Sequence, residues 1–258
     1  MTKPGPDPIS KDECREALRL ATERLGHPPT LREYRSLDLS PNASTIKRRF
    51  NGWNAAKEDI GLETEPSSYE INESYFCDID TPRKAYWVGL FWADGHLDRD
   101  GRFNLTSIDR DHLQTLLDDL EAEHHIYHHD DTPQICIRNE SLVKSLNDLG
   151  ATPTKSSTGY LPSLDDWAWP HFTRGLFDGD GHARNNPNRS LVIIQNQDRL
   201  RRLKQHIPVE GSIHEGNETH RIGWWGDDFE QMVRWIYPDG YDTEPALARK
   251  RDPLLNWI

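Results

Sequence analysis

The chain carries two closely similar strings, WVGLFWADG at residues 87–95 and TRGLFDGDG at residues 173–181. Each string is largely apolar and places two small residues four positions apart, Gly89 with Ala93 and Gly175 with Gly179. Residues four apart lie on one face of a helix, so each string predicts a helix with one smooth face. Two smooth faces allow two helix backbones to approach closely, and the strings therefore predict a packed helix pair.

Both predicted helices end in Asp-Gly, at Asp94-Gly95 and at Asp180-Gly181. The pattern predicts that each glycine takes the left-handed conformation that often follows a helix C-terminus. An aspartate in the last turn opposes the helix macrodipole, which is unfavourable unless a cation lies beside it. Packing the helices side by side would bring the two carboxylates together, and they repel each other unless divalent metal neutralises them. The pair is therefore a candidate metal site.

The sequence after each string repeats one order of elements. Hairpins are predicted at residues 99–101 and 130–133, each followed by an apolar-faced helix, and a strand, helix, hairpin and helix follow the second string. This repetition predicts an α+β domain at residues 83–258 with a pseudo-two-fold axis. Repeat one covers about residues 83–155 and repeat two about residues 156–258.

The paired strings resemble the LAGLIDADG motif, and their doubling resembles the two-motif, single-chain homing endonucleases. Similarity extends to residues 84–87, Lys155-Ser156 and residues 172–175, and covers about residues 75–254 in all. The resemblance implies a tandem αββαββ fold with a saddle of antiparallel strands. Trp92, Thr173 and Arg174 depart from the family consensus, but the final acid of each motif is present.

In that family the last acid of each motif binds Mg²⁺ and activates water. The resemblance therefore implies that Asp94 and Asp180 are catalytic residues and ligands of Mg²⁺ or Mn²⁺. The backbone carbonyl groups of Ala93 and Gly179 are candidates for further ligands. Lys155 matches a family position near the cleavage centre and is a candidate for stabilising phosphate charge, with an ordinary linker lysine as the alternative.

Residues 1–62 predict a small all-α module of the helix-turn-helix kind. Ser10 with Glu13 and Thr30 with Glu33 have the spacing of capping boxes, which predicts two helix starts. Ser40-Pro41 predicts an N-cap and a first-turn proline for a third helix that contains no acid and ends at Phe50. A helical bundle whose basic face is merely solvated is the alternative.

This module resembles the homing endonuclease-associated repeat over about residues 10–62. The matching residues are Gly26, Pro29-Thr30, Tyr34, Ser44-Thr45-Ile46, Arg48, Phe50, Gly52-Trp53-Asn54 and Gly61-Leu62. That repeat is usually a DNA-binding accessory unit, so the predicted DNA-binding residues are Ser44, Thr45, Lys47, Arg48 and Arg49. Residues 63–82 are acidic and contain Pro, Ser and Asn, which predicts a linker or a loosely docked strap.

The formal charge of −12 opposes nucleic-acid binding, which depends on neutralising phosphates. Arginine outnumbers lysine by 22 to nine, and 26 of the 43 acids are Asp. Such a surface is expected in a halophilic host, with an ordinary acidic cytosolic protein as the equal alternative. Three segments contain no acid, at residues 39–57, 149–164 and 181–197. They predict surfaces kept clear for an anionic ligand.

Several classes of protein are excluded. No apolar run approaches the ~20 residues of a membrane span, and the first ten residues lack a signal-peptide apolar region. Cys14, Cys77 and Cys136 form no CxxC pair, which excludes a disulfide framework and a thiolate zinc site. We therefore expect a cytoplasmic protein with no membrane partner. The sequence contains no P-loop or HExxH pattern, so no nucleotide cofactor is implied.

Alternation along the predicted strands separates core-facing from outward-facing side chains. Phe103, Leu105, Ile135 and Ile137 are expected to face inward. The outward candidates for DNA contact are Arg102, Asn104, Thr106, Gln134 and Arg138 in repeat one, and Arg184, Arg189 and Arg221 in repeat two. Such side chains read base edges in the major groove, although a one-residue register slip would reverse every assignment.

These patterns predict a monomer that cuts double-stranded DNA at a long asymmetric site. Two different half-sites on one chain remove the need for dimerisation. An intron RNA-splicing maturase is one alternative, because the same saddle can bind folded RNA. A catalytically silent regulator is another, and it would bind its site without cutting.

Overall fold

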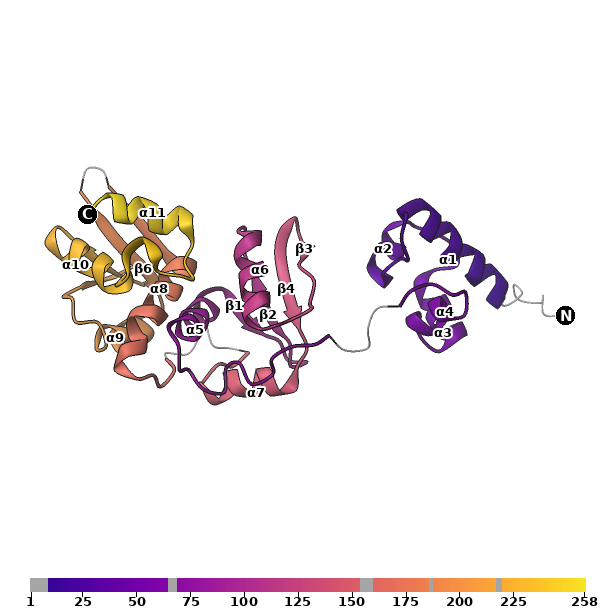
Figure 1. The fold of residues 1–258 in the computed structure, drawn as a ribbon, viewed down its shortest axis with the longest axis horizontal. Coiled ribbons are helices and arrows are strands. Elements are labelled where there is room, and N and C mark those ends of the chain that lie inside the picture. Colours follow the sequence, from indigo (N-terminus) through magenta and orange to yellow (C-terminus); the bar gives the residue numbers. More distant parts are fainter. Residues whose placement is uncertain (1–8, 65–68, 154–159, 186–187, 217–219) are drawn as a thin grey trace. The chain divides into compact units, whose positions relative to one another are not determined.

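A computed structural model describes residues 9–64, 69–153, 160–185, 188–216 and 220–258 (Figure 1). The chain divides into two compact units, residues 1–68 and residues 69–258. Each unit has its own buried apolar core. Among the described residues, every helix falls short of the length and apolar character that a membrane span requires.

The described part of the first unit, residues 9–64, contains four helices around a small core. They are α1 (Lys11–Leu25), α2 (Leu31–Ser36), α3 (Ala43–Phe50) and α4 (Trp53–Glu58). Both predicted capping boxes are present, at Ser10 with Glu13 and at Thr30 with Glu33, and Gly26 ends α1 in the left-handed conformation. The core groups Cys14, Ala17, Leu18, Ala21, Tyr34, Ala43, Ile46, Phe50, Trp53 and Ala56.

The start of α3 differs from the prediction. Asn42, and not Ser40, is its N-cap, because the Asn42 side chain accepts a hydrogen bond from the backbone N–H of Thr45 at 2.9 Å. Pro41 therefore lies ahead of the helix, where its carbonyl oxygen accepts a 2.8 Å hydrogen bond from the Tyr34 hydroxyl. The buried tyrosine fixes the turn that leads into the basic helix.

The second unit contains two repeats of one element order. Repeat one holds α5 (Pro82–Asp94), β1 (Gly95–Leu97), β2 (Phe103–Thr106), α6 (Arg110–Asp119), β3 (Tyr127–His129), β4 (Thr132–Ile137) and α7 (Glu140–Asp148). Repeat two holds α8 (Trp169–Asp180), β5 (Gly181–Arg184), β6 (Ser190–Gln195), α9 (Gln197–Lys204), β7 (Ser212–Glu215), β8 (His220–Trp225) and α10 (Asp227–Ile236). Among the described residues, the unit also contains 3₁₀ turns at Asp166–Ala168 and Gly240–Asp242 and a further helix, α11 (Ala248–Asn256).

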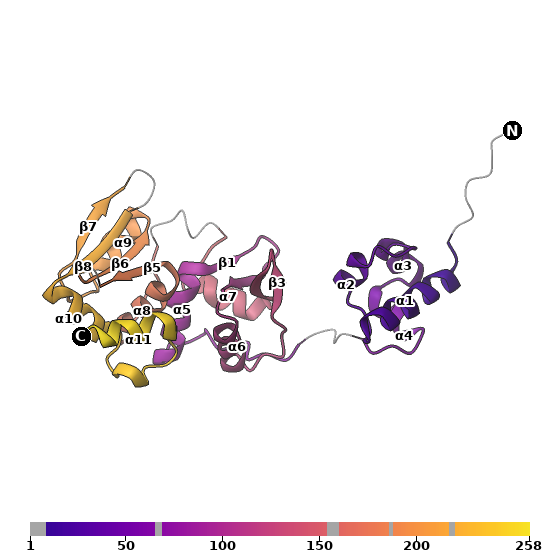
Figure 2. The same ribbon diagram turned by 90° about the horizontal axis from the view of Figure 1, so that it is seen from above.

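Each repeat forms one four-stranded antiparallel sheet with the same strand order. The orders are β1-β2-β4-β3 and β5-β6-β8-β7, and the motif helices α5 and α8 pack against each other between the sheets (Figure 2). Gly95 pairs with Leu105 in the first sheet, and Gly181 pairs with Ile193 in the second. The predicted tandem αββαββ fold with antiparallel strands is confirmed.

Two features differ from the prediction. A further helix, α11, follows α10. The acidic segment before α5 belongs to the second unit from Tyr69 onward, since Tyr75 and Phe76 are buried in its core. The backbone N–H of Asn72 also donates to the carbonyl oxygen of Leu120 at 2.8 Å. Residues 69–82 are therefore docked on the domain, as in the strap alternative, and do not form a linker.

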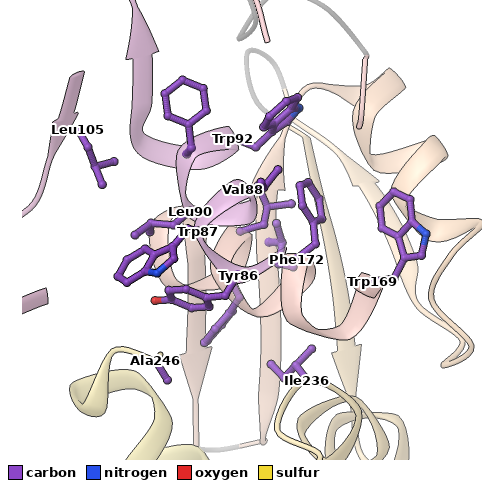
Figure 3. Packing of buried hydrophobic residues seen from close by; sticks show 14 of the residues in the cluster. Tyr86, Trp87, Val88, Leu90, Trp92, Leu105, Trp169, Phe172, Ile236 and Ala246 are labelled. Atoms are coloured by element: carbon purple, nitrogen blue, oxygen red, sulfur yellow. The ribbon is translucent and has the colours of Figure 1, made fainter. Parts of the chain in front are cut away.

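The motif helices lie at the centre of the second unit. Figure 3 shows Tyr86, Val88 and Leu90 of α5 beside Phe172 of α8, with Trp92 at the strand end of α5. All five side chains are at most 3% exposed. An apolar helix buried on every side is expected where it packs between two sheets.

Candidate functional site

The motif helices meet through their backbones. A Cβ atom on Gly89 would lie 2.0 Å from the carbonyl oxygen of Phe172, and one on Gly175 would lie 2.1 Å from that of Tyr86. Phe172 and Tyr86 each lie three residues before the glycine of their own string. The contact therefore follows the pseudo-two-fold axis, and no side chain fits at either glycine without separating the helices.

The two acids that end the motif helices come close together. A Cβ atom on Gly179 would lie 2.3 Å from the Cβ of Ala93 and 3.1 Å from Oδ2 of Asp94. Asp94 thus lies beside the residue that precedes Asp180. Asp94 is exposed and Asp180 is half-buried, so both carboxylates are accessible from the end of the helix pair.

The glycines after the acids are required for a different reason from the one predicted. Gly95 has φ −76° and Gly181 has φ −93°, which is extended backbone and not the left-handed conformation. A Cβ atom would lie 2.0 Å from the ring of Phe91 at Gly95 and 2.1 Å from that of Phe177 at Gly181. Each glycine makes room for an aromatic ring, so that the chain can leave the helix directly into β1 or β5.

Gln195 and Arg199 complete the surroundings of Asp180, and sequence reasoning missed both. Gln195 ends β6, and its side-chain amide donates a hydrogen bond to Oδ2 of Asp180. Arg199 is 1% exposed and donates to the side-chain oxygen of Gln195 and, at 3.5 Å, to the carbonyl oxygen of Trp92. Burial lowers the pKa of Arg199, and the nearby charge of Asp180 partly offsets this. Their spacing of four, spanning a strand end and a helix start, was the available signal.

Lys250 of α11 was also missed. Its Nζ donates to the carbonyl oxygens of Phe177, Asp178 and Gly181 at 2.9, 2.6 and 2.8 Å, and to that of Gly179 at 3.3 Å. The ammonium group therefore neutralises the negative end of α8, where Asp180 is otherwise unfavourable. Burial lowers the pKa of Lys250, while the charges of Asp178, Asp94 and Asp180 raise it. No sequence pattern marks Lys250, because its partners are main-chain atoms.

Asp178, the only other acid in the two strings, is turned away from the Asp94–Asp180 pair into the core. Its Oδ2 accepts hydrogen bonds from the Tyr86 hydroxyl and the Leu247 backbone N–H, both at 2.8 Å. The Tyr86 hydroxyl also lies 2.7 Å from Nε2 of His112. Burial raises the pKa of Asp178 to about 6. Its hydrogen bonds link the two repeats, which indicates a structural role for this carboxyl.

The Asp94–Asp180 pair offers the donors that a hard divalent cation prefers. Mg²⁺ binds carboxylate and carbonyl oxygens and retains several waters, so two acids suffice as the protein's charged ligands. Asp94 lies beside Gly179, the residue that precedes Asp180. Within the described ranges no group of three or more His, Cys, Asp and Glu forms a metal cage, and the carbonyl of Gly179 already faces Lys250. The residues therefore fit an open site that is completed by water and substrate.

In repeat one, the residues predicted to contact DNA lie on the face of the sheet that is turned away from the core. Phe103, Leu105, Ile135 and Ile137 are buried. Arg102, Asn104, Thr106 and Gln134 are half-buried, and Arg138 is exposed. The guanidinium of Arg102 lies 3.5 Å from Asp98 and 3.7 Å from Asp100, which reduces the positive charge it presents.

In repeat two, two of the three arginine candidates lie on the outward face. Arg184 and Arg221 are exposed at outward positions of β5 and β8. Arg189 is not: its guanidinium lies 5.8 Å from the ring centre of Phe229 and donates to the carbonyl oxygen of Trp257. It packs on the helix side of the sheet, because it shares the parity of the core-facing Leu191 and Ile193 of β6.

The basic helix of the first unit presents its charged side chains to solvent. Ser44, Lys47 and Arg48 are exposed, and Thr45 and Arg49 are half-buried, while Ile46 and Phe50 face the core. The predicted Lys155 lies outside the described residues.

Comparison with known proteins agrees with this geometry. The family model described as homing endonuclease associated repeat matches residues 9–63. A search of curated proteins found no match.

Solved structures of LAGLIDADG proteins are similar to 69–79% of this chain. The LAGLIDADG meganuclease I-AabMI bound to uncleaved DNA has a TM-score of 0.50 and 12% identity, over 69% of this chain and 88% of that chain. The homing endonuclease I-WcaI bound to its DNA recognition sequence has a TM-score of 0.45 and 13% identity, over 79% and 91%. The N-terminal LAGLIDADG domain of DUF199/WhiA has a TM-score of 0.42 and 15% identity, over 70% and 93%. Residues 9–63 thus match the homing endonuclease associated repeat, and the second unit has the fold of the LAGLIDADG homing endonucleases.

Proposed function

We propose that the protein is a site-specific endonuclease that cuts double-stranded DNA with the help of Mg²⁺ or Mn²⁺. The observation that carries this proposal is the placement of Asp94 and Asp180 at the adjoining ends of α5 and α8, between two equivalent sheets. The solved structure of I-AabMI, which has the same fold, holds uncleaved DNA.

Hydrolysis of a phosphodiester needs charge stabilisation at the phosphate and an activated water. A divalent cation would supply both, by polarising the phosphoryl oxygens and lowering the pKa of its bound water. Asp94 and Asp180 would hold this cation through carboxylate oxygens, with the carbonyl group of Ala93 as a candidate for a further ligand. The carbonyl of Gly179, predicted for the same role, faces the Lys250 ammonium instead. Gln195 orients the Asp180 carboxylate through its amide hydrogen bond.

Two lysines are candidates for stabilising charge on the scissile phosphates, Lys250 through its field alone because its ammonium already donates to main-chain carbonyls. Lys250 places a positive charge behind the end of α8, beside the proposed cation site. Lys155 is the candidate that the family resemblance implies for repeat one. Either ammonium would stabilise negative charge that grows on the phosphate in the transition state.

The outward faces of the two sheets form the proposed DNA surface. Its polar residues are Arg102, Asn104, Thr106, Gln134 and Arg138 in repeat one and Arg184 and Arg221 in repeat two. The strands β1, β2, β4, β5, β6 and β8 contain no acid, so this surface avoids the repulsion that the net charge would otherwise cause. Because each repeat supplies its own sheet, we propose that a monomer binds an asymmetric site.

Residues 1–62 are proposed as a second DNA-binding unit that acts through Ser44, Thr45, Lys47, Arg48 and Arg49. A tethered second unit raises affinity through effective concentration without entering the active site. Removing residues 1–62 should therefore weaken binding about a hundredfold and leave the rate of cutting of saturated duplex unchanged. Equal affinity and an unchanged footprint would assign a structural role to this unit.

The composition supports a cytoplasmic protein of a salt-rich host. Aspartate and arginine dominate its charged residues, and lysine is scarce. Folding, followed by circular dichroism, should persist at molar KCl. Loss of structure on raising KCl from low to molar concentration would contradict this proposal.

The decisive experiment is selection of cleaved sites from a randomised duplex library in Mg²⁺. Recovery of one long asymmetric site, cut on both strands, would establish the proposed activity. Recovery of bound but uncut sites would indicate a silent DNA-binding regulator. Competition of the selected duplex by structured RNA, but not by unrelated duplex, would indicate a splicing factor.

A further inference from the structure

The outward faces of the two sheets differ in chemistry. In repeat one, the outward positions of β1, β2 and β4 hold the polar side chains His96, Asn104, Thr106 and Gln134, with Cys136 among them. In repeat two, the corresponding face carries Val192, Ile194 and Trp225, which we call the Trp225 patch. Ile194 is 41% exposed and Trp225 is 38% exposed. Large apolar side chains gathered on one open face of a soluble domain indicate a binding surface.

Trp225 is held flat against the sheet. A Cβ atom on Gly223 would lie 2.4 Å from Cη2 of the indole, so the ring covers the space that a side chain at this position would need. His214 of β7 meets the ring edge-on, with ring centres 5.2 Å apart and planes at 84°. A glycine below and a histidine beside the ring fix its position before any ligand arrives, which reduces the entropy lost on binding.

Positive charge flanks the Trp225 patch. Strand register places Ile194 opposite Arg221, and Trp225 opposite Ser190, which in turn pairs with Arg184. Both arginines are exposed, and β5, β6 and β8 contain no acid. An apolar centre between cations matches a duplex groove, where apolar groups lie on the floor between two lines of phosphates.

We propose that the Trp225 patch contacts the C5-methyl groups of thymines, so that the half-site bound by repeat two is read largely through A·T pairs. This inference rests on the proposed function and names part of its substrate. The thymine methyl is the one apolar group that bases present in the major groove. Asn185 and Asn188 line a pocket of about 570 Å³ beside Trp225, and asparagine pairs with adenine edges. RNA would offer no such methyl, since uracil lacks it.

The test uses the full chain and a selected duplex, with thymines replaced by deoxyuridine in one half-site at a time. Each lost methyl contact should weaken binding about fourfold, as expected for one buried carbon, and only in the half-site bound by repeat two. Binding is measured by gel shift in EDTA, so that cutting does not interfere. Equal sensitivity of the two half-sites would overturn the inference.

Two variants test whether the loss of affinity for deoxyuridine duplexes arises from the Trp225 patch. Ile194→Thr retains β-branching at an exposed position but replaces an ethyl group by a hydroxyl, and Trp225→Gln removes the ring. Each should lose the fourfold difference at the thymines that its own side chain contacts, and the double variant should bind thymine and deoxyuridine duplexes with nearly equal affinity. The matched control, Asn104→Ala in repeat one, should retain the fourfold difference while lowering affinity for both duplexes.

The outcomes separate this inference from the proposed function. Retention of the full deoxyuridine effect in Ile194→Thr and Trp225→Gln would overturn the inference, as would a neutral deoxyuridine substitution in a duplex that the protein still cuts. Failure to bind or cut any duplex would overturn the proposed function, and the inference with it.

Discussion

The two repeats share one backbone plan but surround their aspartates with different side chains. Register aligns Leu105 with Ile193, because they pair with Gly95 and Gly181, and therefore Ser107 stands where repeat two has Gln195. Gln195 donates to Asp180, whereas the Ser107 hydroxyl accepts from the backbone N–H of Asp109. The serine closes a turn at the position where the glutamine orients a carboxylate.

The helices that follow β2 and β6, which are α6 and α9, also differ in their side chains. Asp109 and Asn196 are the N-caps of α6 and α9, which aligns His112 with Arg199. Both side chains are buried, but His112 contacts the Tyr86 hydroxyl while Arg199 contacts Gln195. Burial lowers the pKa of His112 to about 4, so it is neutral at pH 7, and arginine stays charged. Symmetry is thus a property of the backbone, and the chemistry of each half is set by its own side chains.

Removing either aspartate should have the largest effect. Asp94→Asn and Asp180→Asn keep the shape but remove the charge that attracts the cation, so double-strand cutting should fall on the order of 10³-fold. Binding should be retained or become tighter, because a carboxylate near phosphate is removed. Unfolding free energy should hold or rise by about 0.5 kcal/mol, since an anion leaves a helix C-terminus.

Cutting of each DNA strand by the two variants can be measured separately on a nicking gel. Equal loss on both strands would show that the two acids act as one site despite their unequal surroundings. Full cutting by either variant at unchanged Mg²⁺ would contradict the catalytic assignment.

The backbone contact between α5 and α8 predicts that changes at Gly89 and at Gly175 destabilise the fold equally. Gly89→Ala and Gly175→Ala each place a Cβ about 2 Å from a carbonyl oxygen of the other helix, which forces the helices apart. Each should lower the free energy of unfolding in urea by about 3 kcal/mol. Replacement of the exposed Gln231 by Ala on α10 serves as control and should change it by less than about 0.5 kcal/mol. A large difference between the two glycine variants would show that the repeats do not share this contact equally.

The position occupied by Gln195 and Ser107 tests the asymmetry directly. Gln195→Ala should raise the Mg²⁺ concentration needed for half-maximal cutting about tenfold, because the Asp180 carboxylate loses the group that orients it. Ser107→Ala should change it little. A similar shift in both variants would mean that the hydrogen bond to Asp180 has no role in holding the cation.

Acid should expose the difference between His112 and Arg199. A histidine whose folded pKa lies below its unfolded value contributes full stability above about pH 6.5 and loses it as pH falls toward 4. Between pH 7 and pH 5 this costs about 2 kcal/mol, and His112→Gln should not show that loss. Asp178, with its raised pKa of about 6, acts in the opposite direction and stabilises the fold as pH falls through 6. Urea unfolding of the unchanged protein and of His112→Gln, at pH 7 and at pH 5, measures the two losses of stability. Identical losses would contradict the role assigned to His112.

The fold and the aspartate pair could be predicted from the sequence because both depend on patterns among residues close together in the chain. Small residues four apart define a helix face, and alternation at Phe103 and Leu105 defines a strand face, so both follow from periodicity. Capping boxes at Ser10 and Thr30 mark helix starts for the same reason.

The rest of the site depends on contacts between residues far apart in the chain. Lys250 binds carbonyl oxygens about seventy residues before it, and Arg199 reaches Trp92 in the other repeat. Neither pairing leaves a periodic trace in the sequence. Gly95 and Gly181 were given the wrong conformation because the aromatic ring that crowds each one depends on side-chain packing, which a terminal Asp-Gly does not reveal.

The glycine contact between α5 and α8 has a consequence for pairing specificity. Where two helices touch through Gly89, Gly175 and main-chain carbonyls, the surface of one repeat offers few features that exclude a copy of itself. Repeats expressed as separate chains would therefore form like pairs as well as mixed pairs. What enforces the mixed pair in the native protein is covalent continuity, together with side chains outside the contact, such as the Tyr86–Asp178 hydrogen bond that only unlike repeats can make. An engineer who wished to exchange half-sites between such proteins would need to transplant that hydrogen bond along with the repeat.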